Sequence, residues 1–350
     1  MLSPENPLSV GFSPETSHQT ALLIELLNRT DSTLQFTPEK QWELLAKAHA
    51  PAQHFATSEA MVVVGQAINI SSLNAMIKQY FPSVNVFTFS LHPLHKEFAQ
   101  QAVIVNLHHS GTDSLLSTSY LSEISTAFFV DCFAVSQVDL KQAGLLVMDM
   151  DSTIINMECI DEIAALAGVG EKVSELTERA MRGELDFNQS LFARVDCLKG
   201  IEVDALASLK ARLPVNPGFA KTMRILQANG WQTVIASGGF TYFANYLKET
   251  FELSEAFSNT LGINGSTLNG TVEGDIVNGE MKRSILLEQQ RIHAIKEQQT
   301  VAIGDGANDL LMMEAAQLGV AYKAKPKVKA QADASIQYCG FEGLLYCLKQ

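Results

Sequence analysis

Two aspartates directly follow a short apolar run in residues 145–153, LLVMDMDST. The run is typical of a buried strand, and Asp149 and Asp151 stand two positions apart at its end. Neighbouring carboxylates repel each other and lose hydration when they are buried, so this pair requires a nearby cation, a reaction that uses it, or both. One carboxylate could attack phosphorus as a nucleophile while the other transfers protons.

Two further polar segments stand at the ends of predicted strands. Ser237-Gly238-Gly239 closes the apolar stretch that starts at residue 231, and Asp305 comes directly after TVAIG (300–304). In an open parallel sheet the carboxyl ends of the strands meet at one edge, and binding sites form there. If these strands are neighbours, the two aspartates, the serine and Asp305 converge on one site.

The residue types at this edge predict a divalent cation beside a bound anion. Asp149, Asp151 and Asp305 offer hard oxygen ligands, which suit Mg²⁺ in an octahedral shell completed by water. A serine hydroxyl followed by two glycines can hold an oxyanion, because backbone N–H groups approach it closely there. One lysine should complete this anion site, and Lys282, just inside a predicted helix, is the best-placed candidate.

The motifs DMDST, SGG, a lysine and GDGAND, in that order, resemble the haloacid-dehalogenase (HAD) superfamily of aspartate-nucleophile phosphatases. The resemblance covers about residues 144–345. Three longer stretches resemble the branch of this superfamily that hydrolyses O-phospho-L-serine to serine and phosphate, the final step of serine biosynthesis: MECIDEIAALAG (157–168), RAMRGELDFNQSLFARV (179–195) and ASGGF (236–240). The resemblance implies a phosphoric monoester hydrolase with Mg²⁺ as its cofactor and a small molecule as its substrate.

The resemblance also implies a role for each matching residue. Asp149 would be the nucleophile that forms an aspartyl-phosphate, and Asp151 would protonate the leaving serine oxygen and then activate water. Asp149, Asp305 and the backbone carbonyl of Asp151 would bind Mg²⁺. The other implied residues are Asp309 as a direct or indirect metal partner, Ser237, Gly238, Lys282 and Asn308 around the phosphoryl group, Glu158 for the substrate ammonium, Arg194 for its carboxylate, and Met181 and Phe187 as pocket walls.

From residue 144 onward, predicted strands alternate with helices, which is typical of a doubly wound parallel sheet. We therefore expect a phosphatase domain over residues 141–350, preceded by a polar linker at 137–143. The helical stretch at about 158–213 is too long for an ordinary crossover and predicts an inserted cap.

Two local patterns in this domain predict turns and a helix start. Asn264-Gly265 and Asn278-Gly279 are typical of hairpin turns, so residues 258–281 predict a small β excursion. Asn216 followed by Pro217 is typical of an N-cap and the first position of a helix.

Residues 56–140 predict a compact α+β unit of the ferredoxin-like type with the element order β-α-β-β-α-β. By that order it resembles an ACT-type regulatory domain. Amino-acid sensing and a dimerising or purely structural role both stay open for it, so a homodimer through this unit is one expectation. Residues 1–55 predict a helical extension with helices at 20–30 and 37–50, the second starting at Thr37-Pro38.

The composition restricts the class of partner. Among 350 residues, 25 Lys and Arg against 38 Asp and Glu give a net charge of −13, which argues against non-specific binding to nucleic acid. Five cysteines without a C-x-x-C pair indicate reduced thiols in a cytoplasmic protein. The first residues lack the pattern of a signal peptide, and no apolar run approaches the roughly 20 residues of a membrane span.

Two alternatives of different kinds stay open at this point. The same core would serve a phosphatase for another small phosphorylated metabolite, because only Glu158, Arg194 and the cap distinguish the substrates. An amino-acid-responsive regulatory protein would carry this core without turnover, although the intact set of aspartates argues against that reading.

Overall fold

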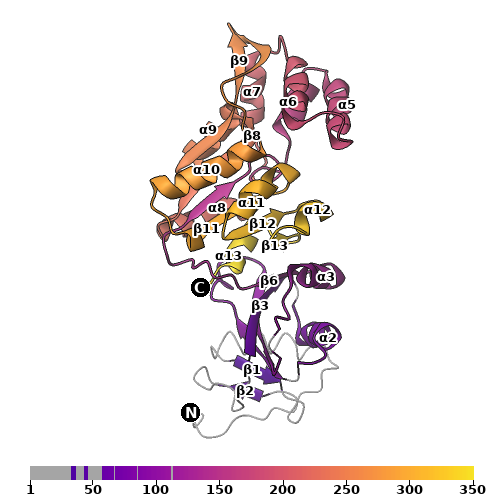
Figure 1. Ribbon diagram of the computed structural model, residues 1–350, viewed down its shortest axis with the longest axis vertical. Coiled ribbons are helices and arrows are strands. Elements are labelled where there is room, and N and C mark those ends of the chain that lie inside the picture. Colours follow the sequence, from indigo (N-terminus) through magenta and orange to yellow (C-terminus); the bar gives the residue numbers. More distant parts are fainter. Residues whose placement is uncertain (1–32, 37–42, 46–56, 67, 85, 112) are drawn as a thin grey trace. The chain divides into compact units, whose positions relative to one another are not determined.

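The structure is a computed structural model of the 350-residue chain, and it describes residues 33–36, 43–45, 57–66, 68–84, 86–111 and 113–350 (Figure 1). The chain divides into two compact units. Unit 1 comprises residues up to Ser136 together with the C-terminal segments 334–339 and 343–350, and unit 2 comprises residues 137–333 and 340–342. The sequence alone assigns all of residues 141–350 to one domain. The structure differs from this expectation, because it places segments 334–339 and 343–350 in unit 1.

Unit 1 contains an antiparallel sheet with the strand order β2-β1-β4-β5-β3-β6. Its elements are β1 (Thr33–Phe36), β2 (Glu43–Leu45), β3 (Thr57–Gly65), α2 (Ile70–Tyr80), β4 (Val86–Leu91), β5 (Gln101–His109), α3 (Thr118–Phe128), β6 (Asp131–Ala134) and, from the C-terminal segments, β13 (Ala334–Ile336) and α13 (Gly343–Cys347). From β3 to β6 the order of elements is β-α-β-β-α-β, so the predicted ferredoxin-like arrangement is confirmed.

The predicted N-terminal helices have a different outcome. The helix expected over 37–50 is wrong at Glu43–Leu45, which is strand β2 and pairs with β1. Pairing with another segment can override local helix propensity, because tertiary contacts outweigh the small free-energy preferences of single residues. The helix expected over 20–30 lies outside the described residues.

A buried carboxylate joins the C-terminal segment to unit 1. Asp131 at the start of β6 is 0% exposed, and its Oδ1 accepts the backbone N–H of Gln337 at 2.8 Å. Its Oδ2 accepts the N–H groups of Tyr338 and Cys339 at 3.0 and 2.7 Å. Three donors on one carboxylate compensate its lost hydration, so the last residues of the chain are an integral part of unit 1.

Replacing Asp131 with Asn is expected to lower the free energy of unfolding by about 3 kcal/mol, because an amide removes the charge and turns an N–H₂ group toward N–H donors. Urea unfolding followed by circular dichroism measures the loss. Asp333→Asn is the matched control, since that carboxylate accepts the N–H of Gly319 at 2.8 Å but is not part of this three-donor contact. An equal loss of stability in the two variants would contradict the role of the three-donor contact of Asp131 in stabilising unit 1.

Unit 2 contains a sheet with the strand order β10-β9-β8-β7-β11-β12, in which every described pair is parallel except β9 with β10. The elements that form it and its helical layers are β7 (Leu145–Met148), α8 (Phe219–Ala228), β8 (Gln232–Phe240), α9 (Thr241–Thr250), β9 (Glu255–Asn264), β10 (Thr267–Glu273), α10 (Gly279–Ile292), β11 (Thr300–Gly304), α11 (Leu310–Ala315), β12 (Leu318–Tyr322) and α12 (Pro326–Lys329). The predicted doubly wound α/β fold is confirmed.

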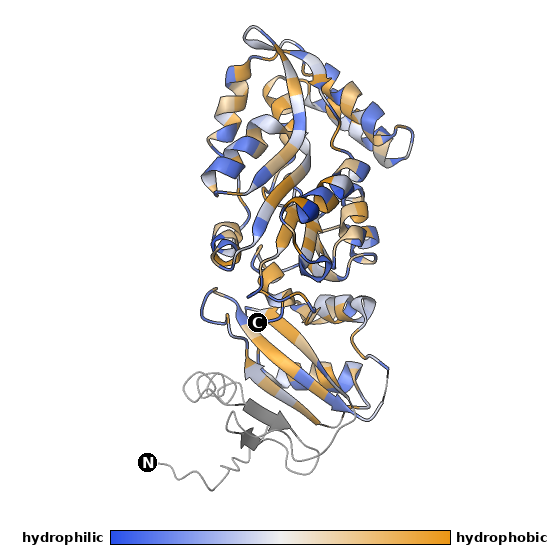
Figure 2. Cartoon of the chain, turned by 60° about the vertical axis from the view of Figure 1, so that its left-hand side comes forward, coloured by the Kyte–Doolittle hydropathy of each residue, from blue (hydrophilic) through white to orange (hydrophobic). Residues whose placement is uncertain are grey.

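Strand β7 lies at the centre of this sheet, between β8 and β11. All four of its residues are buried, and Leu145 and Val147 pack in one cluster with Leu286 of α10 and Met312 of α11. Continuous burial of this kind is expected of a parallel strand with helices on both faces, and Figure 2 shows the apolar character of the sheet.

The cap consists of four helices between β7 and α8: α4 (Cys159–Leu166), α5 (Gly170–Met181), α6 (Phe187–Asp196) and α7 (Val203–Lys210). They lie within the predicted range 158–213. The β9–β10 hairpin bonds to the same region, because the N–H of Gly200 donates to the carbonyl of Leu268, and the N–H of Leu268 to the carbonyl of Ile201, each at 2.8 Å. The hairpin is therefore a part of the cap, which the sequence does not indicate.

The predicted turns are partly right. Gly265 has φ +64° in the β9–β10 turn, as expected for Asn264-Gly265. The turn predicted at Asn278-Gly279 is wrong, because Asn278 is the N-cap of α10 and its side chain accepts the N–H of Met281 at 3.1 Å.

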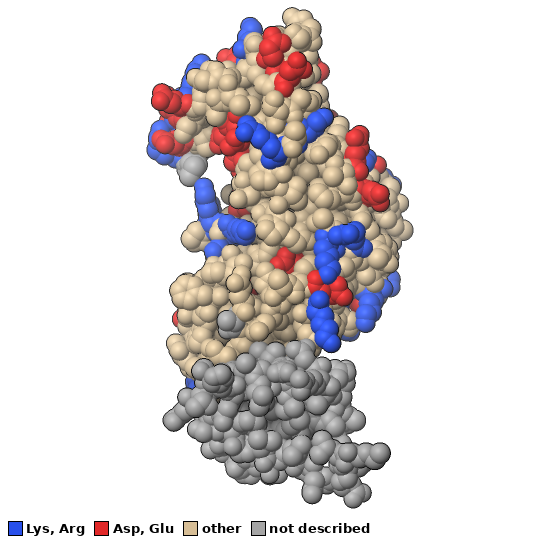
Figure 3. All heavy atoms as spheres, turned by 180° about the vertical axis from the view of Figure 1, so that it is seen from behind, with Lys and Arg blue, Asp and Glu red and all other residues tan. Residues whose placement is uncertain are grey.

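Figure 3 shows the charged side chains on one face of the molecule. On this face, described acidic and basic side chains are interspersed. Among the described residues, none of the helices has the length and apolar character that a membrane span requires.

Candidate active site

The site starts where β7 ends at the carboxyl edge of the sheet. The Asp149 N–H donates to the carbonyl of Ile303 on β11 at 3.0 Å, and Asp149 Oδ1 accepts the N–H of Met150 at 2.7 Å. The chain then turns sharply, with the N–H groups of Thr153 and Ile154 on the Met150 carbonyl and Ser152 in the left-handed region at φ +56°. This turn fixes Asp149 and Asp151 at the tip of the strand.

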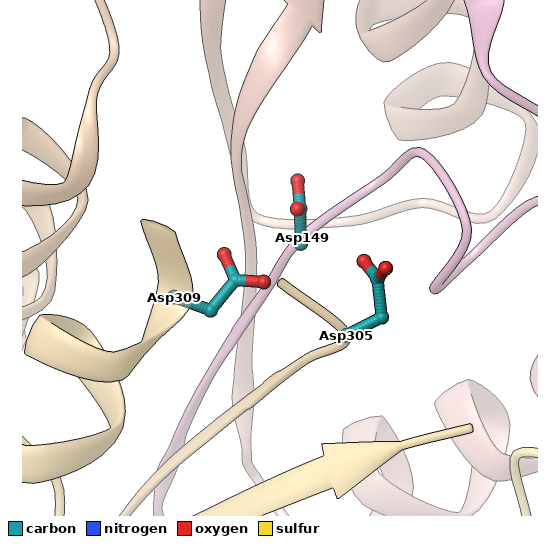
Figure 4. Close-up of side chains that lie close together, drawn as sticks. All are labelled: Asp149, Asp305 and Asp309. Carbon is teal, nitrogen blue, oxygen red and sulfur yellow. The ribbon is translucent and has the colours of Figure 1, made fainter. Parts of the chain in front are cut away.

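Three carboxylates meet at this edge. Asp149 follows β7, Asp305 follows β11, and Asp309 ends a short 3₁₀ turn after β11. One oxygen from each of them lies within 4.8 Å of the others (Figure 4). The convergence of the β7 and β11 tips predicted from the sequence is therefore present.

Lys282 lies beside this cluster. Its Nζ is 2.8 Å from Asp149 Oδ2 and 2.6 Å from Asp309 Oδ1, and its side chain is 0% exposed. Burial alone lowers the pKa of Lys282. The carboxylates of Asp149 and Asp309 raise it by more, so the pKa lies above its usual value and the ammonium stays charged. A single ammonium offsets only part of the charge of three carboxylates.

The pKa values of the acidic groups reflect the negative charge that Lys282 leaves uncompensated. Burial, reinforced by the carboxylates of Asp149 and Asp309, raises the pKa of Asp305 to about 8. Burial and then Asp149 raise the pKa of Asp309 to about 7. Carboxylates that resist ionisation to this degree, with oxygens as their donor atoms, fit a hard divalent cation that would compensate their charge.

The end of β8 lines another side of the site with Ser237, Gly238 and Gly239. Ser237 is 0% exposed, and the N–H of Gly239 donates to its Oγ at 3.0 Å. A side chain at Gly238 would lie 2.9 Å from the ring of Phe187, and one at Gly239 would lie 2.6 Å from Met150 Cε and 2.8 Å from Asp151 Oδ2. Glycine is required at both positions because the tips of β7 and β8 and the cap approach so closely.

Asn259 on β9 fixes this loop, and sequence reasoning missed it. Its side chain is 0% exposed; its Nδ2 donates to the Gly238 carbonyl at 2.8 Å and its Oδ1 accepts the N–H of Val277 at 2.9 Å. Asn259 thus ties the serine-glycine loop to the segment that leads into α10 and Lys282. A lone amide inside a strand pattern gives no indication of such a bridge in the sequence.

Asn216 also has a role that differs from the prediction. Helix α8 starts at Phe219 behind Gly218, so Asn216 is not its N-cap. Its Nδ2 instead donates to the Thr153 carbonyl at 2.8 Å and holds the turn that follows Asp151.

The cap adds two charged residues. Glu158 precedes α4 and accepts the Ser152 hydroxyl at 2.7 Å. Arg194 lies on α6, which Asp186 and Gln189 start with a capping box, and its Nε donates to the Ser190 carbonyl at 3.3 Å. Burial lowers the pKa of Arg194 and the nearby carboxylates oppose this, so the guanidinium remains charged next to Glu158.

Together these residues line a cavity of about 160 Å³, which is smaller than the pockets that take drug-sized ligands and leaves room for a small metabolite at most. The predicted residues on its wall are Asp149, Asp151, Glu158, Phe187, Arg194, Ser237, Gly238, Asp305 and Asn308. Lys282 and Asp309 lie buried next to it, through their contacts with Asp149 and Gly306. Met181 ends α5, but its side chain lies outside the described part of the structure. Apolar wall residues that the sequence did not predict are Ile160, Leu191 and Phe240.

The fold and this site define a class of protein. A parallel sheet with a helical cap after its first strand, and an aspartate at the tip of that strand, is the arrangement of the haloacid dehalogenase-like hydrolases. Residues 144–317 match the family model of these hydrolases.

Comparison with individual relatives shows to which family of hydrolases the chain belongs. Over 232 residues the chain is 50% identical to a phosphoserine phosphatase of Vibrio cholerae, covering 66% of this chain and 71% of that relative. The crystal structure of a probable phosphoserine phosphatase from Vibrio cholerae, in unliganded form, has a TM-score of 0.69 at 40% identity over 83% of this chain and 86% of that one. A substrate-bound phosphoserine phosphatase has a TM-score of 0.57 at 38% identity, over 59% of this chain and 99% of that one. The chain belongs to the phosphoserine phosphatase family.

Proposed function

We infer that this enzyme is a phosphoserine phosphatase, which hydrolyses O-phospho-L-serine to serine and phosphate in the final step of serine biosynthesis. One observation supports this inference most directly. A buried aspartate, Asp149, lies beside the Lys282 ammonium and two further carboxylates, and the cap contributes Glu158 and Arg194 to the wall of the same cavity. The first group suits a phosphoryl ester and the second suits the two charges of an amino acid.

Asp149 is the proposed nucleophile. The Met150 N–H at Oδ1 and the Lys282 ammonium at Oδ2 fix the orientation of its carboxylate. A carboxylate oxygen attacks phosphorus, the bond from phosphorus to the serine oxygen breaks, and an aspartyl-phosphate forms. A fixed nucleophile reduces the entropic part of the barrier, which is large for phosphate esters.

Asp151 is the proposed proton donor and acceptor. Burial, and next the carboxylate of Glu158, raise its pKa well above the usual range. A carboxyl group that keeps its proton near neutral pH can give it to the leaving serine oxygen. The resulting carboxylate can then take a proton from the water that hydrolyses the aspartyl-phosphate.

The phosphoryl oxygens would lie against the Ser237 hydroxyl, the N–H groups of the following glycines and the Lys282 ammonium, with Asn308 at the same wall. We propose Mg²⁺ as the cofactor, held by Asp149, Asp305 and the Asp151 carbonyl, with Asp309 behind them on Lys282. Bound there, Mg²⁺ supplies positive charge for the carboxylates and for the phosphoryl oxygens in the transition state.

Removal and return of Mg²⁺ should show a defined dependence on pH. Asp305 and Asp309 have pKa values of about 8 and about 7, above the unfolded value, so the folded apoenzyme binds more protons than the unfolded chain between about pH 4 and 8. The stability of the apoenzyme therefore falls as pH rises through this window, because ionisation places charge in the cluster.

Mg²⁺ competes with those protons, so its apparent affinity should rise between pH 6 and 7 by up to about tenfold per pH unit for each carboxyl group that loses its proton on binding. Differential scanning calorimetry with chelator and with saturating Mg²⁺ measures the effect. We expect the rise in Tm on Mg²⁺ addition to be larger at pH 8 than at pH 6. A rise that is independent of pH would argue against Asp305 and Asp309 as the groups that respond.

Arg194 is the proposed partner of the substrate carboxylate, and Glu158 of its ammonium. A guanidinium binds a carboxylate through two parallel hydrogen bonds, which a shortened side chain cannot replace. Arg194→Ala is expected to raise KM for phosphoserine about 100-fold. It should change KM for phosphoethanolamine, which lacks the carboxylate, by less than about threefold.

The measurement is Mg²⁺-dependent phosphate release from both substrates, with chelator as the blank. Arg224→Ala on the exposed face of α8 is the control variant, because the one hydrogen bond of Arg224 to a described residue goes to the Ala220 carbonyl of its own helix. If Arg194→Ala affected the two substrates equally, the enzyme would recognise some other feature of phosphoserine, and a different phosphorylated metabolite would become the better candidate.

Two properties of the whole chain remain proposals. We propose a homodimer through unit 1, which light scattering of the full chain would test. We also propose a cytoplasmic location, where reduced thiols persist, because none of the five cysteines forms a disulfide in the described part of the chain.

A further inference from the structure

Asn259 is a buried asparagine next to the serine-glycine loop, and the reaction described above assigns it no part. It lies on β9 and is 0% exposed. Its Nδ2 donates to the Gly238 carbonyl at 2.8 Å, and its Oδ1 accepts the Val277 N–H at 2.9 Å. Each end of the amide thus pairs with a backbone group of another segment, and this side chain determines how the two segments face each other.

The pairing of β8 with β9 explains why the loop needs a side-chain partner. Ser237 and Phe240 of β8 pair with two consecutive residues of β9, the second of which is Asn259, so the two glycines between them form a bulge. A bulge interrupts the ladder and leaves backbone groups without their usual strand partners. The Asn259 side chain supplies a donor to one of these groups, the Gly238 carbonyl.

The bond to the Gly238 carbonyl also fixes the N–H group that follows it. A trans peptide unit is planar, so the Gly238 carbonyl and the Gly239 N–H point in opposite directions from one rigid plane. With the carbonyl on Asn259, the Gly239 N–H donates to Ser237 Oγ at 3.0 Å. Among the described residues this hydroxyl has no acceptor, and it lines the cavity, so its own hydrogen stays available for a phosphoryl oxygen.

The other end of the amide connects the loop to the helix that carries Lys282. Val277 precedes Asn278, the N-cap of α10, and the Lys282 N–H donates to the Asn278 carbonyl at 2.9 Å. A side chain at Gly238 would lie 3.5 Å from the Val277 carbonyl, so the loop and the start of this helix are in close contact. Asn259 therefore joins the segments that supply the hydroxyl and the ammonium of the anion site.

We propose that Asn259 is a positioning residue for the phosphoryl group, because it holds the Gly238–Gly239 peptide so that the Ser237 hydroxyl is directed at a phosphoryl oxygen. The proposal rests on the proposed function, in which the phosphoryl oxygens lie against this hydroxyl. Asn259 does not line the cavity and acts only through the loop. Its loss should weaken the hold on the phosphoryl group and leave the amino-acid end of the site unchanged.

The test uses two variants of the full chain. Asn259→Leu has nearly the same shape without polar atoms, and Asn259→Ser is too short to reach both partners. Each leaves the Gly238 carbonyl without its donor, so the peptide can rotate and withdraw the Gly239 N–H from Ser237. We expect kcat/KM for phosphoserine, measured as Mg²⁺-dependent phosphate release, to fall about tenfold in both variants.

Inhibition by the two products distinguishes the ends of the site. Inorganic phosphate reports on the place of the phosphoryl group, and serine reports on the place of the amino acid. In Asn259→Leu the inhibition constant of phosphate should rise about tenfold, while that of serine should stay within about twofold of wild type. A general loosening of the fold would raise both constants.

A double-mutant cycle with Ser237→Ala tests the route through the hydroxyl. Once the hydroxyl is absent, its orientation no longer matters, so Asn259→Leu should lower kcat/KM by less than about twofold in the Ser237→Ala background. A loss of about tenfold in that background as well would show that Asn259 acts by another route.

Asn229 supplies the matched control. It is a partly buried asparagine at the end of α8, and it does not line the cavity. Its Nδ2 donates to the Ile225 carbonyl of its own helix at 2.8 Å. Asn229→Leu and Asn229→Ser should leave kcat/KM and both inhibition constants unchanged.

Three results would overturn the proposal. They are an unchanged kcat/KM in folded Asn259→Leu, an equal rise of the two inhibition constants, and a loss of the same size with and without the Ser237 hydroxyl. If Asn259→Leu does not fold, as judged by its Tm, Asn259→Ser provides the same comparisons, because a small hydroxyl is better tolerated beside buried backbone polar groups. A wild-type enzyme that released no phosphate from phosphoserine would instead refute the proposed function, and the two failures are therefore distinguishable.

Discussion

Asp149→Asn is expected to lower kcat for phosphoserine by about 10⁴-fold or more, because an amide is a very poor nucleophile toward phosphorus. The fold should survive the change. The amide oxygen can still accept the N–H of Met150, and the loss of one negative charge relieves the repulsion that Asp149 exerts on Asp305 and Asp309. We expect the apoenzyme variant to be at least as stable as wild type and to bind Mg²⁺ more weakly.

Three measurements check this result. Phosphate release gives kcat, acid quench with radiolabelled phosphoserine traps the phosphoenzyme, and calorimetry shows that the variant is folded. Asp204→Asn, at the exposed start of α7, is the control for a lost surface carboxylate. A fully active Asp149→Asn enzyme, or a phosphoenzyme that still accumulates in it, would exclude Asp149 as the nucleophile.

Lys282→Met is expected to reduce both activity and stability. Its ammonium contacts Asp149 and Asp309 at 2.8 and 2.6 Å inside the protein, and methionine fills similar space without charge. Removing one partner of a buried ion pair usually costs about 3–5 kcal/mol of stability, because the remaining charges stay without compensation. We expect kcat to fall about 10³-fold, since the phosphoryl oxygens also lose a cation.

The stability loss should depend on pH and on Mg²⁺. At low pH, protons on the carboxylates replace the missing ammonium, so the difference from wild type should be smaller at pH 5 than at pH 8. Mg²⁺ should recover part of the loss at pH 8. Urea unfolding with and without chelator measures both effects, and Lys172→Met on the exposed face of α5 is the control. A loss that is the same at both pH values would show that Lys282 acts by packing alone.

Much of the candidate site could be predicted because each of its motifs directly follows a buried strand. The apolar run before Asp149 and the one before Asp305 specify strands, and neighbouring parallel strands bring their carboxyl ends together. Asn259 could not be predicted. It acts through contacts with the Gly238 carbonyl and the Val277 N–H on other segments, and an asparagine is not unusual in a strand.

The fold shows the same difference between features that follow from local sequence and features that depend on distant contacts. Alternating strands and helices predict the parallel sheet of unit 2, because this periodicity is local. The bonds between Gly200 and Leu268 in the cap, and those between Asp131 and Gln337 in unit 1, join residues far apart in the chain. Strand β2 depends in the same way on its pairing with β1, which overrides the helical appearance of its sequence.

The Asp131 contact has a consequence for the order of events during synthesis. Most of unit 1 is synthesised first, yet its structure includes residues 334–339 and 343–350, which follow most of unit 2 in the chain. The catalytic unit contains none of residues 343–350, so it can fold before they are present. A released chain that ends at residue 342 should therefore carry a folded catalytic unit, while the amino-terminal unit still lacks residues 343–350.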